Sequence, residues 1–186
     1  MKEKQKLILL YSGGLDSTLL LEMALKMGYQ VYCILVNYKQ LHAKELDNAE
    51  KYLRNKKISF ALINVEGLDV DSVLKNGVKK YTGVSEFHVP SRNMMFISFA
   101  ASYAEHLGVN LIWYGANMAD RNALFPDCYQ EWIYAMNQVL KINGSFPIKL
   151  EAPLIGMDKD TIRNLAKTYN INEEEVFSGY GLIKAE

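Results

Sequence analysis

The sequence predicts an α/β domain in which helices cover both faces of a parallel sheet. Three observations lead to this fold class. The chain has 186 residues and a 49% hydrophobic fraction, which suits one sizeable core. Strand-like apolar segments alternate with longer segments of helical periodicity, as in parallel sheets with crossover helices. The first such strand passes through a glycine-rich bend directly into an apolar helix.

The expected elements follow one another in regular order along the chain. Strands are expected at residues 6–12, 30–38, 59–66 and 110–117, and helices at 16–27, about 40–55, 94–107, about 127–142 and 159–169. The helices at 16–27 and 94–107 are apolar around most of their circumference, so both are expected in the interior. The helix at 127–142 gathers its apolar side chains on one face, namely Trp132, Ile133, Met136, Val139 and Leu140.

The composition favours a small substrate over a polyanion. Lysine plus arginine number 21, as do aspartate plus glutamate, so the formal net charge is zero. This balance gives no global attraction to nucleic acid or to a membrane surface. The apolar stretches fall short of the ~20 residues of a spanning helix, and the N-terminus leads into a strand and not into a cleavage site. We therefore expect a cytoplasmic protein that binds neither nucleic acid nor membrane.

The glycine-rich bend "SGGLDS", residues 12–17, has the composition of an anion cradle. Gly13 and Gly14 allow a sharp turn and a close approach of ligand to backbone, and the following helix offers free N–H groups. Ser12, Ser17 and Thr18 add hydroxyl donors to the same rim. The spacing is neither that of a Walker A loop nor that of a dinucleotide fingerprint. The structural alternative is a tight strand-to-helix turn with Asp16 as N-cap.

This loop resembles the signature of the N-type ATP pyrophosphatases, which cleave ATP between the α and β phosphates to adenylate a substrate. The resemblance implies a Rossmann-like fold of the HUP, or adenine nucleotide α-hydrolase-like, type. It also implies ATP and Mg²⁺ as cofactors, with Asp16 as a direct or indirect magnesium partner. The implied ATP-binding residues are Tyr11, Ser12, Gly13, Gly14, Leu15, Asp16, Ser17, Thr18 and Gly115.

Three further stretches narrow the resemblance to the 7-cyano-7-deazaguanine synthases of queuosine-precursor synthesis. They are "NYKQLHAKEL" at 37–46, "VPSRN" at 89–93 and "GANMADRNALFPDCYQEW" at 115–132. Each follows a strand or opens a helix, so all are expected at one edge of the sheet. The implied substrate-binding residues are Gln40, His42, Arg92, Asn93, Asp120, Pro126, Asp127 and Glu131, and the implied catalytic residues are Asp16, Lys159 and Arg92.

Simpler structural roles are open for several of these residues. His42 can be a surface histidine, Asp127 a helix-opening carboxylate and Lys159 a solvated helix residue. Arg92 at a helix start opposes the helix dipole, so an anionic ligand explains it better. Cys128 near a helix N-terminus would favour a thiolate, but adenylation followed by attack of ammonia needs no cysteine nucleophile. We assign Cys128 no catalytic role.

The chain departs from the synthase pattern in two places. The tail "EEEVFSGYGLIKAE" carries Gly179 where that family has the first of four zinc-binding cysteines, and Cys33 and Cys128 lie in unrelated segments. A closed zinc site needs four Cys or His ligands, so no zinc is expected. Two cysteines are also too few for a disulfide framework. In addition, Lys39 and Leu41 replace a glycine and an arginine of the family motif. We expect one domain over residues 1–186 with a short zinc-free tail.

The resemblance implies a carbon–nitrogen ligase that converts 7-carboxy-7-deazaguanine and ammonia into 7-cyano-7-deazaguanine through an acyl adenylate and an amide. One alternative within the same fold stops at the amide or couples the activated carboxylate to another amine. A different alternative is a nonenzymatic subunit that binds ATP for a partner. Related synthases are dimers, so the resemblance also implies a homodimer.

Overall fold

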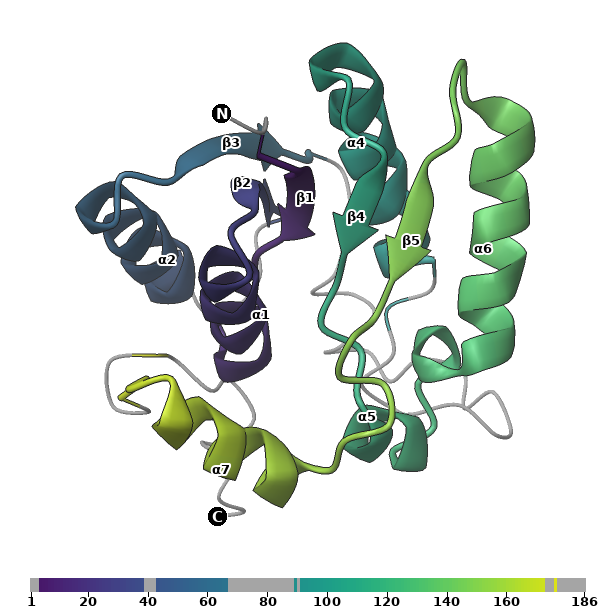
Figure 1. Cartoon of the computed structure of the whole chain (residues 1–186). Coiled ribbons are helices and arrows are strands. Elements are labelled where there is room, and N and C mark those ends of the chain that lie inside the picture. The colour runs from purple at the N-terminus through teal and green to yellow at the C-terminus, as the bar shows by residue number, and fades with distance from the viewer. Residues whose placement is uncertain (1–3, 39–42, 67–88, 90, 173–175, 177–186) are drawn as a thin grey trace.

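A five-stranded parallel sheet forms the centre of the computed structural model, which describes residues 4–38, 43–66, 89, 91–172 and 176. The strand order is β3-β2-β1-β4-β5, and all neighbouring pairs are parallel. The strands are β1 (Lys6–Leu10), β2 (Gln30–Asn37), β3 (Ser59–Asn64), β4 (Leu111–Trp113) and β5 (Lys149–Glu151). The chain moves outward from β1 in one direction through β2 and β3, then returns to place β4 on the other side of β1 (Figure 1).

Helices cover both faces of this sheet (Figure 1). One layer holds α1 (Leu15–Lys26), α2 (Ala43–Asn55) and α7 (Lys159–Thr168), and the other holds α4 (Arg92–Leu107) and α6 (Gln130–Asn143). Leu7 and Leu9 of β1 face the α1 layer, whereas Ile8 faces the α4 layer. Because both faces are buried, the central strands are apolar without interruption. The predicted fold class is confirmed.

Several expected boundaries are wrong. The strand expected at 110–117 pairs only over Leu111–Trp113, and β5 was not predicted at all. The helix expected from residue 127 begins at Gln130, because Pro126–Cys128 form a separate 3₁₀ turn, η1. A short helix, α5 (Met118–Asn122), precedes that turn. Val139 is 53% exposed and therefore does not belong to the buried face of α6, unlike Ile133, Met136 and Leu140.

The interior position expected for the helix at 94–107 is also wrong, because only Ile97, Ala100 and Ala104 of α4 are buried and Met94 is 46% exposed. The expected positions of the helices along the chain otherwise hold within the described residues. The helix expected from Met94 begins two residues earlier, at Arg92, and that expected from Asp16 begins at Leu15. The helix expected at about 40–55 is present over Ala43–Asn55, and residues 40–42 lie outside the described part. None of the helices in the described ranges has the length and apolar character that crossing a bilayer requires.

Candidate active site

The glycine loop between β1 and α1 is closed by its own serine side chains. Ser17 Oγ donates a hydrogen bond to the carbonyl of Gly14 over 3.0 Å and accepts one from the backbone N–H of Ser12 over 3.3 Å. The backbone N–H of Gly14 in turn donates to Ser12 Oγ over 3.3 Å. Gly13 has φ 84°, a conformation that requires glycine, and Gly14 is the N-cap of α1. Asp16 lies inside the first turn, so it is not the cap.

Tyr11 and Thr18 lie beneath the loop, in the core. Thr18 has no exposed surface, and its hydroxyl lies 3.1 Å from the hydroxyl of Tyr11. Burial raises the pKa of Tyr11, so this phenol stays neutral. The Thr18 hydroxyl is thus directed at Tyr11 in this structure, and its place on the ligand-facing rim stays a prediction. The pair supports the loop from below.

A charged cluster forms where the loop meets the ends of two other elements. Lys159, in the first turn of α7, places its Nζ 2.7 Å from Oδ2 of Asp16 and 3.9 Å from Oδ1 of Asp120. Asn117 joins the same two carboxylates through hydrogen bonds of 2.9 and 2.7 Å. Burial raises the pKa of the Asp120 carboxyl, while the positive charge of Lys159 opposes this increase.

Gly115 brings the end of β4 against the first turn of α1. A Cβ added at Gly115 would lie 3.5 Å from Cβ of Asp16 and 3.8 Å from the backbone nitrogen of Ser17. These are ordinary van der Waals separations, so an alanine would fit while extending toward the loop. Lys159 is positioned by the start of α7, where Asp158 caps the helix by accepting a 2.7 Å hydrogen bond from the backbone N–H of Thr161.

A second group of predicted residues gathers at the N-terminus of α4. Arg92 donates through Nη1 to the hydroxyl of Tyr38, which follows β2, over 3.3 Å, and its guanidinium lies 5.7 Å from the centre of that ring. The Asn93 side-chain amide donates to Oδ2 of Asp127 in η1. Asp127 is buried, and its carbonyl accepts a 2.6 Å hydrogen bond from the Tyr114 hydroxyl. The segments 89–93 and 115–132, both of which were expected at one edge of the sheet, are therefore in contact in the fold.

The other predicted residues differ in their surroundings. Pro126 opens η1, and Glu131 is exposed in the first turn of α6. Cys128 is buried, and burial together with the nearby Asp127 charge raises its pKa to about 12, so the side chain is a neutral thiol. Gln40 and His42 lie outside the described residues, as do residues 177–186 of the tail.

All of the described site residues follow the carboxyl ends of parallel strands. The loop follows β1, the segment with Asn117 and Asp120 follows β4, and Lys159 lies beyond β5. Strand order reverses between β1 and β4, which are neighbours in space but are separated by β2 and β3 along the chain. Open α/β sheets bind ligands at such a switch point. Asn117 was not predicted, although its place between a strand and Asp120 was visible in "GANMAD".

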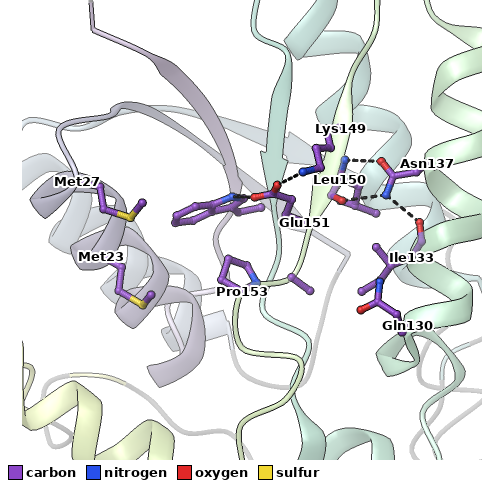
Figure 2. Close-up of a pocket in the computed structure, with 11 residues that line it drawn as sticks. Met23, Met27, Gln130, Ile133, Asn137, Lys149, Leu150, Glu151 and Pro153 are labelled. Carbon is purple, nitrogen blue, oxygen red and sulfur yellow. Dashed lines mark hydrogen bonds and ion pairs between the residues drawn. The ribbon is translucent and has the colours of Figure 1, made fainter.

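A separate groove of about 470 Å³ lies beside β5, and none of the predicted catalytic or binding residues lines it. Figure 2 shows Met23 and Met27 of α1 on one side and residues of α6 on the other. Its two charged residues form an ion pair, in which Nζ of Lys149 lies 2.5 Å from Oε1 of Glu151. Gln130, the first residue of α6, lines the groove, but none of its described lining residues is a glycine and its lysine is paired with Glu151, so it lacks a cradle of the kind formed at Gly13 and Gly14.

Solved structures of other proteins share this fold. The U34-tRNA thiolase NcsA from Methanococcus maripaludis matches with a TM-score of 0.60 and 17% identity, over 96% of this chain and 61% of that chain. The NH₃-dependent NAD synthetase from Campylobacter jejuni matches with a TM-score of 0.58 and 20% identity, over 94% and 68%. Both likenesses show that the fold is shared.

The sequence is more specific than the fold. Residues 6–185 match the family model described as "Queuosine biosynthesis protein QueC". A 7-cyano-7-deazaguanine synthase from Marinobacter nauticus is 34% identical over 83% of this chain and 74% of that protein. Another, from Caldicellulosiruptor bescii, is 31% identical over 93% and 82%. The chain belongs to the QueC family, which confirms the resemblance deduced from the four motifs.

Proposed function

We propose that this chain catalyses the ATP-dependent conversion of 7-carboxy-7-deazaguanine and ammonia into 7-cyano-7-deazaguanine. Family membership and the names of the relatives support this activity. The structural observation that supports it is the contact of the glycine loop with Lys159 through Asp16, together with a second polar group in which Arg92 bonds to Tyr38 and Asn93 bonds to Asp127. The site thus has one part suited to phosphates and a second part suited to another substrate.

The chemistry requires activation because a carboxylate has no usable leaving group. The substrate carboxylate attacks the α-phosphorus of ATP, a P–O bond forms, and pyrophosphate leaves. Ammonia then attacks the acyl carbon and displaces AMP, which gives the amide and releases a proton. The amide oxygen then attacks a second ATP, with loss of pyrophosphate and of one N–H proton, and loss of AMP and the second N–H proton leaves the nitrile. Each step needs negative charge on phosphate to be stabilised.

We assign the ATP phosphates to the loop and to Lys159. The backbone N–H groups at the start of α1 and the positive end of its dipole suit the outgoing pyrophosphate. Asp16 and Asp120 fit Mg²⁺, because that ion is commonly held by one or two carboxylates together with substrate phosphates and water. Bound magnesium would supply positive charge to the phosphate oxygens. Lys159, now paired with Asp16, would be free to contact phosphate once that carboxylate binds a cation.

We assign the second substrate to the α4 side of the site. A guanidinium suits a carboxylate, so Arg92 would bind that end of the deazaguanine, and Tyr38 already orients it through a hydrogen bond. Asp127 and Glu131 would accept hydrogen bonds from the N–H groups of the base. Asn93 would hold Asp127 in place. On the resemblance alone, we also assign Gln40, His42 and Pro126 to the binding of this substrate.

The test is turnover of the purified chain with 7-carboxy-7-deazaguanine, ATP, magnesium and ammonium, followed by product mass measurement. We expect the nitrile, with AMP and pyrophosphate as the nucleotide products. Accumulation of the amide alone would support a reaction that stops earlier. ADP as the sole nucleotide product would show γ-phosphate transfer and exclude the proposed activation. ATP binding without any turnover would favour a nonenzymatic subunit.

A further inference from the structure

Asn117 is a fully buried polar residue whose side chain makes three hydrogen bonds. Its Nδ2 donates to Oδ2 of Asp16 over 2.9 Å and to Oδ2 of Asp120 over 2.7 Å. Its Oδ1 accepts from the backbone N–H of Asp120 over 3.0 Å, which caps α5. The two amide hydrogens and one lone pair are therefore all in use.

Helix capping explains only one of these bonds. Serine, threonine and aspartate cap helices about as well as asparagine, because a cap needs only a side-chain oxygen. Among these residue types asparagine alone also carries two N–H donors. At Asn117 both donors are directed at carboxylates, that of Asp16, which is 101 residues away along the chain, and that of Asp120, which is three residues away. The residue type is thus accounted for by the carboxylates and not by the cap.

The same bonds also affect the position of the positively charged Lys159 side chain. Asp16 and Asp120 carry like charges that would repel one another without a donor between them. With Asn117 between them, both carboxylates face Lys159, whose Nζ lies 2.7 Å from one and 3.9 Å from the other. Moving either carboxylate would change the position of both negative charges and of the lysine.

We infer that Asn117 is a positioning residue, which holds the carboxylates of Asp16 and Asp120 in the orientation that receives magnesium-bound ATP. Asn117 touches no reacting atom and acts through the two aspartates. The inference rests on the proposed function for the identity of the ligand. It predicts a defect in ATP binding that a loss of stability alone would not produce.

Two variants and one matched control test this inference. Asn117→Ser and Asn117→Asp both keep a capping oxygen but remove the amide donors. Asn137 of α6 provides the control, because its side chain likewise donates two hydrogen bonds, to the carbonyls of Ile133 and Leu150, and accepts one, from the N–H of Leu150. These bonds lie beside β5, away from the charged cluster. Asn137→Ser should therefore lower the melting temperature without changing ATP binding.

Calorimetric titration with ATP in the presence and absence of magnesium is the main measurement. We expect each Asn117 variant to weaken magnesium-dependent ATP binding by about tenfold or more, because hydrogen bonds to charged groups are lost. Asn137→Ser should stay within about twofold of the unaltered chain. In turnover assays, the Asn117 variants should show a higher KM for ATP and should need a higher magnesium concentration to reach half of their maximal rate.

Magnesium–ATP affinity that is retained in a folded Asn117 variant would overturn the inference, as would an equal loss in Asn137→Ser. If Asn117→Asp fails to fold, the serine variant decides. The proposed function is tested separately, because the titration needs no deazaguanine. An unaltered chain that binds magnesium–ATP but makes no nitrile would refute the function and leave the role of Asn117 measurable.

Discussion

Asp16 accepts two bonds on one carboxylate oxygen. Lys159 Nζ and Asn117 Nδ2 lie 2.7 and 2.9 Å from the same Oδ2. A cation and a neutral donor thus share one acceptor at the first turn of α1, where the helix dipole also favours a negative charge. Asp16 thus links the glycine loop directly to the segments that follow β4 and β5.

Asp16→Asn should keep the fold and abolish magnesium-dependent turnover. The change hardly alters the volume but removes the charge that Mg²⁺ and Lys159 require. Because the Lys159–Asp16 pair is partly exposed, its loss should cost about 1 kcal/mol or less of stability. Turnover should fall on the order of 100-fold or more. The measurements are steady-state rates over a magnesium titration and thermal unfolding, and unaltered rates would remove Asp16 from the site.

Arg92→Ala and Asp127→Asn should weaken deazaguanine binding strongly and ATP binding much less. Removing one charged partner from a desolvated pocket costs roughly 2 to 5 kcal/mol. Calorimetry with each ligand separates the two effects. Arg163→Ala is the charge control, since Arg163 lies on the exposed side of α7 and pairs with Asp160. Loss of ATP affinity with retained deazaguanine binding would show that the substrate assignment is wrong.

At the scale of the element, the unit formed by β1, the loop and α1 has a polar rim and a hydroxyl pair beneath it. Tyr11 is the first residue after β1, and Thr18 lies in the first turn of α1. Their hydroxyls are 3.1 Å apart in the core. Ser12 and Ser17, in contrast, bond to the loop backbone. Tyr11 and Thr18 therefore support the loop from the core, whereas Ser12 and Ser17 hold its backbone in shape.

Thr18→Val should destabilise the protein by about 1–3 kcal/mol, because it leaves the buried Tyr11 hydroxyl without its partner. ATP affinity should stay nearly constant. The double variant Tyr11→Phe with Thr18→Val should recover most of the lost stability, since both partners are then apolar. Denaturant unfolding and ATP titration of the three proteins check this. A large loss of ATP affinity in a stable Thr18→Val protein would instead show that the Thr18 hydroxyl contributes to ATP binding.

At the scale of the whole molecule, the two cysteines are separated by the sheet. Cys33 belongs to the layer of α1, α2 and α7, and Cys128 belongs to the layer of α4 and α6. We predict that the purified 186-residue chain holds no stoichiometric zinc, because a structural site needs four Cys or His ligands. Elemental analysis after desalting, with and without added zinc, measures this. About one retained zinc per chain would contradict the prediction.

We also predict that the chain is a homodimer at micromolar concentration. This expectation comes from the resemblance to dimeric synthases. Light scattering coupled to size exclusion should give twice the 21.2 kDa mass of the chain. A concentration series provides the control, since a weak dimer would dissociate on dilution. A monomeric mass throughout the series would refute the prediction.

The sequence by itself determined the fold class, the family and most of the elements. Uninterrupted apolar strands, amphipathic helices and the bend at Gly13 are local features, and each depends on residues close together in the chain. The four motifs also predicted which loops carry the candidate site, because the carboxyl ends of parallel strands must meet at one edge. Family membership, supported by the match over residues 6–185, followed from those motifs.

Only the tertiary structure decided how the site is assembled. The Lys159–Asp16 bond joins residues 143 positions apart, and Asn117 reaches Asp16 across 101 positions, so no local pattern could reveal either. The strand β5 was missed because three residues carry little periodicity. It is defined by pairing with β4 and by the side chain of Asn137, which bonds both backbone groups of Leu150. The burial of Thr18 likewise depends on Tyr11, which reaches it from the other side of the loop. Hydrogen bonds and burial of this kind depend on three-dimensional distance, which the order of residues along the chain does not contain.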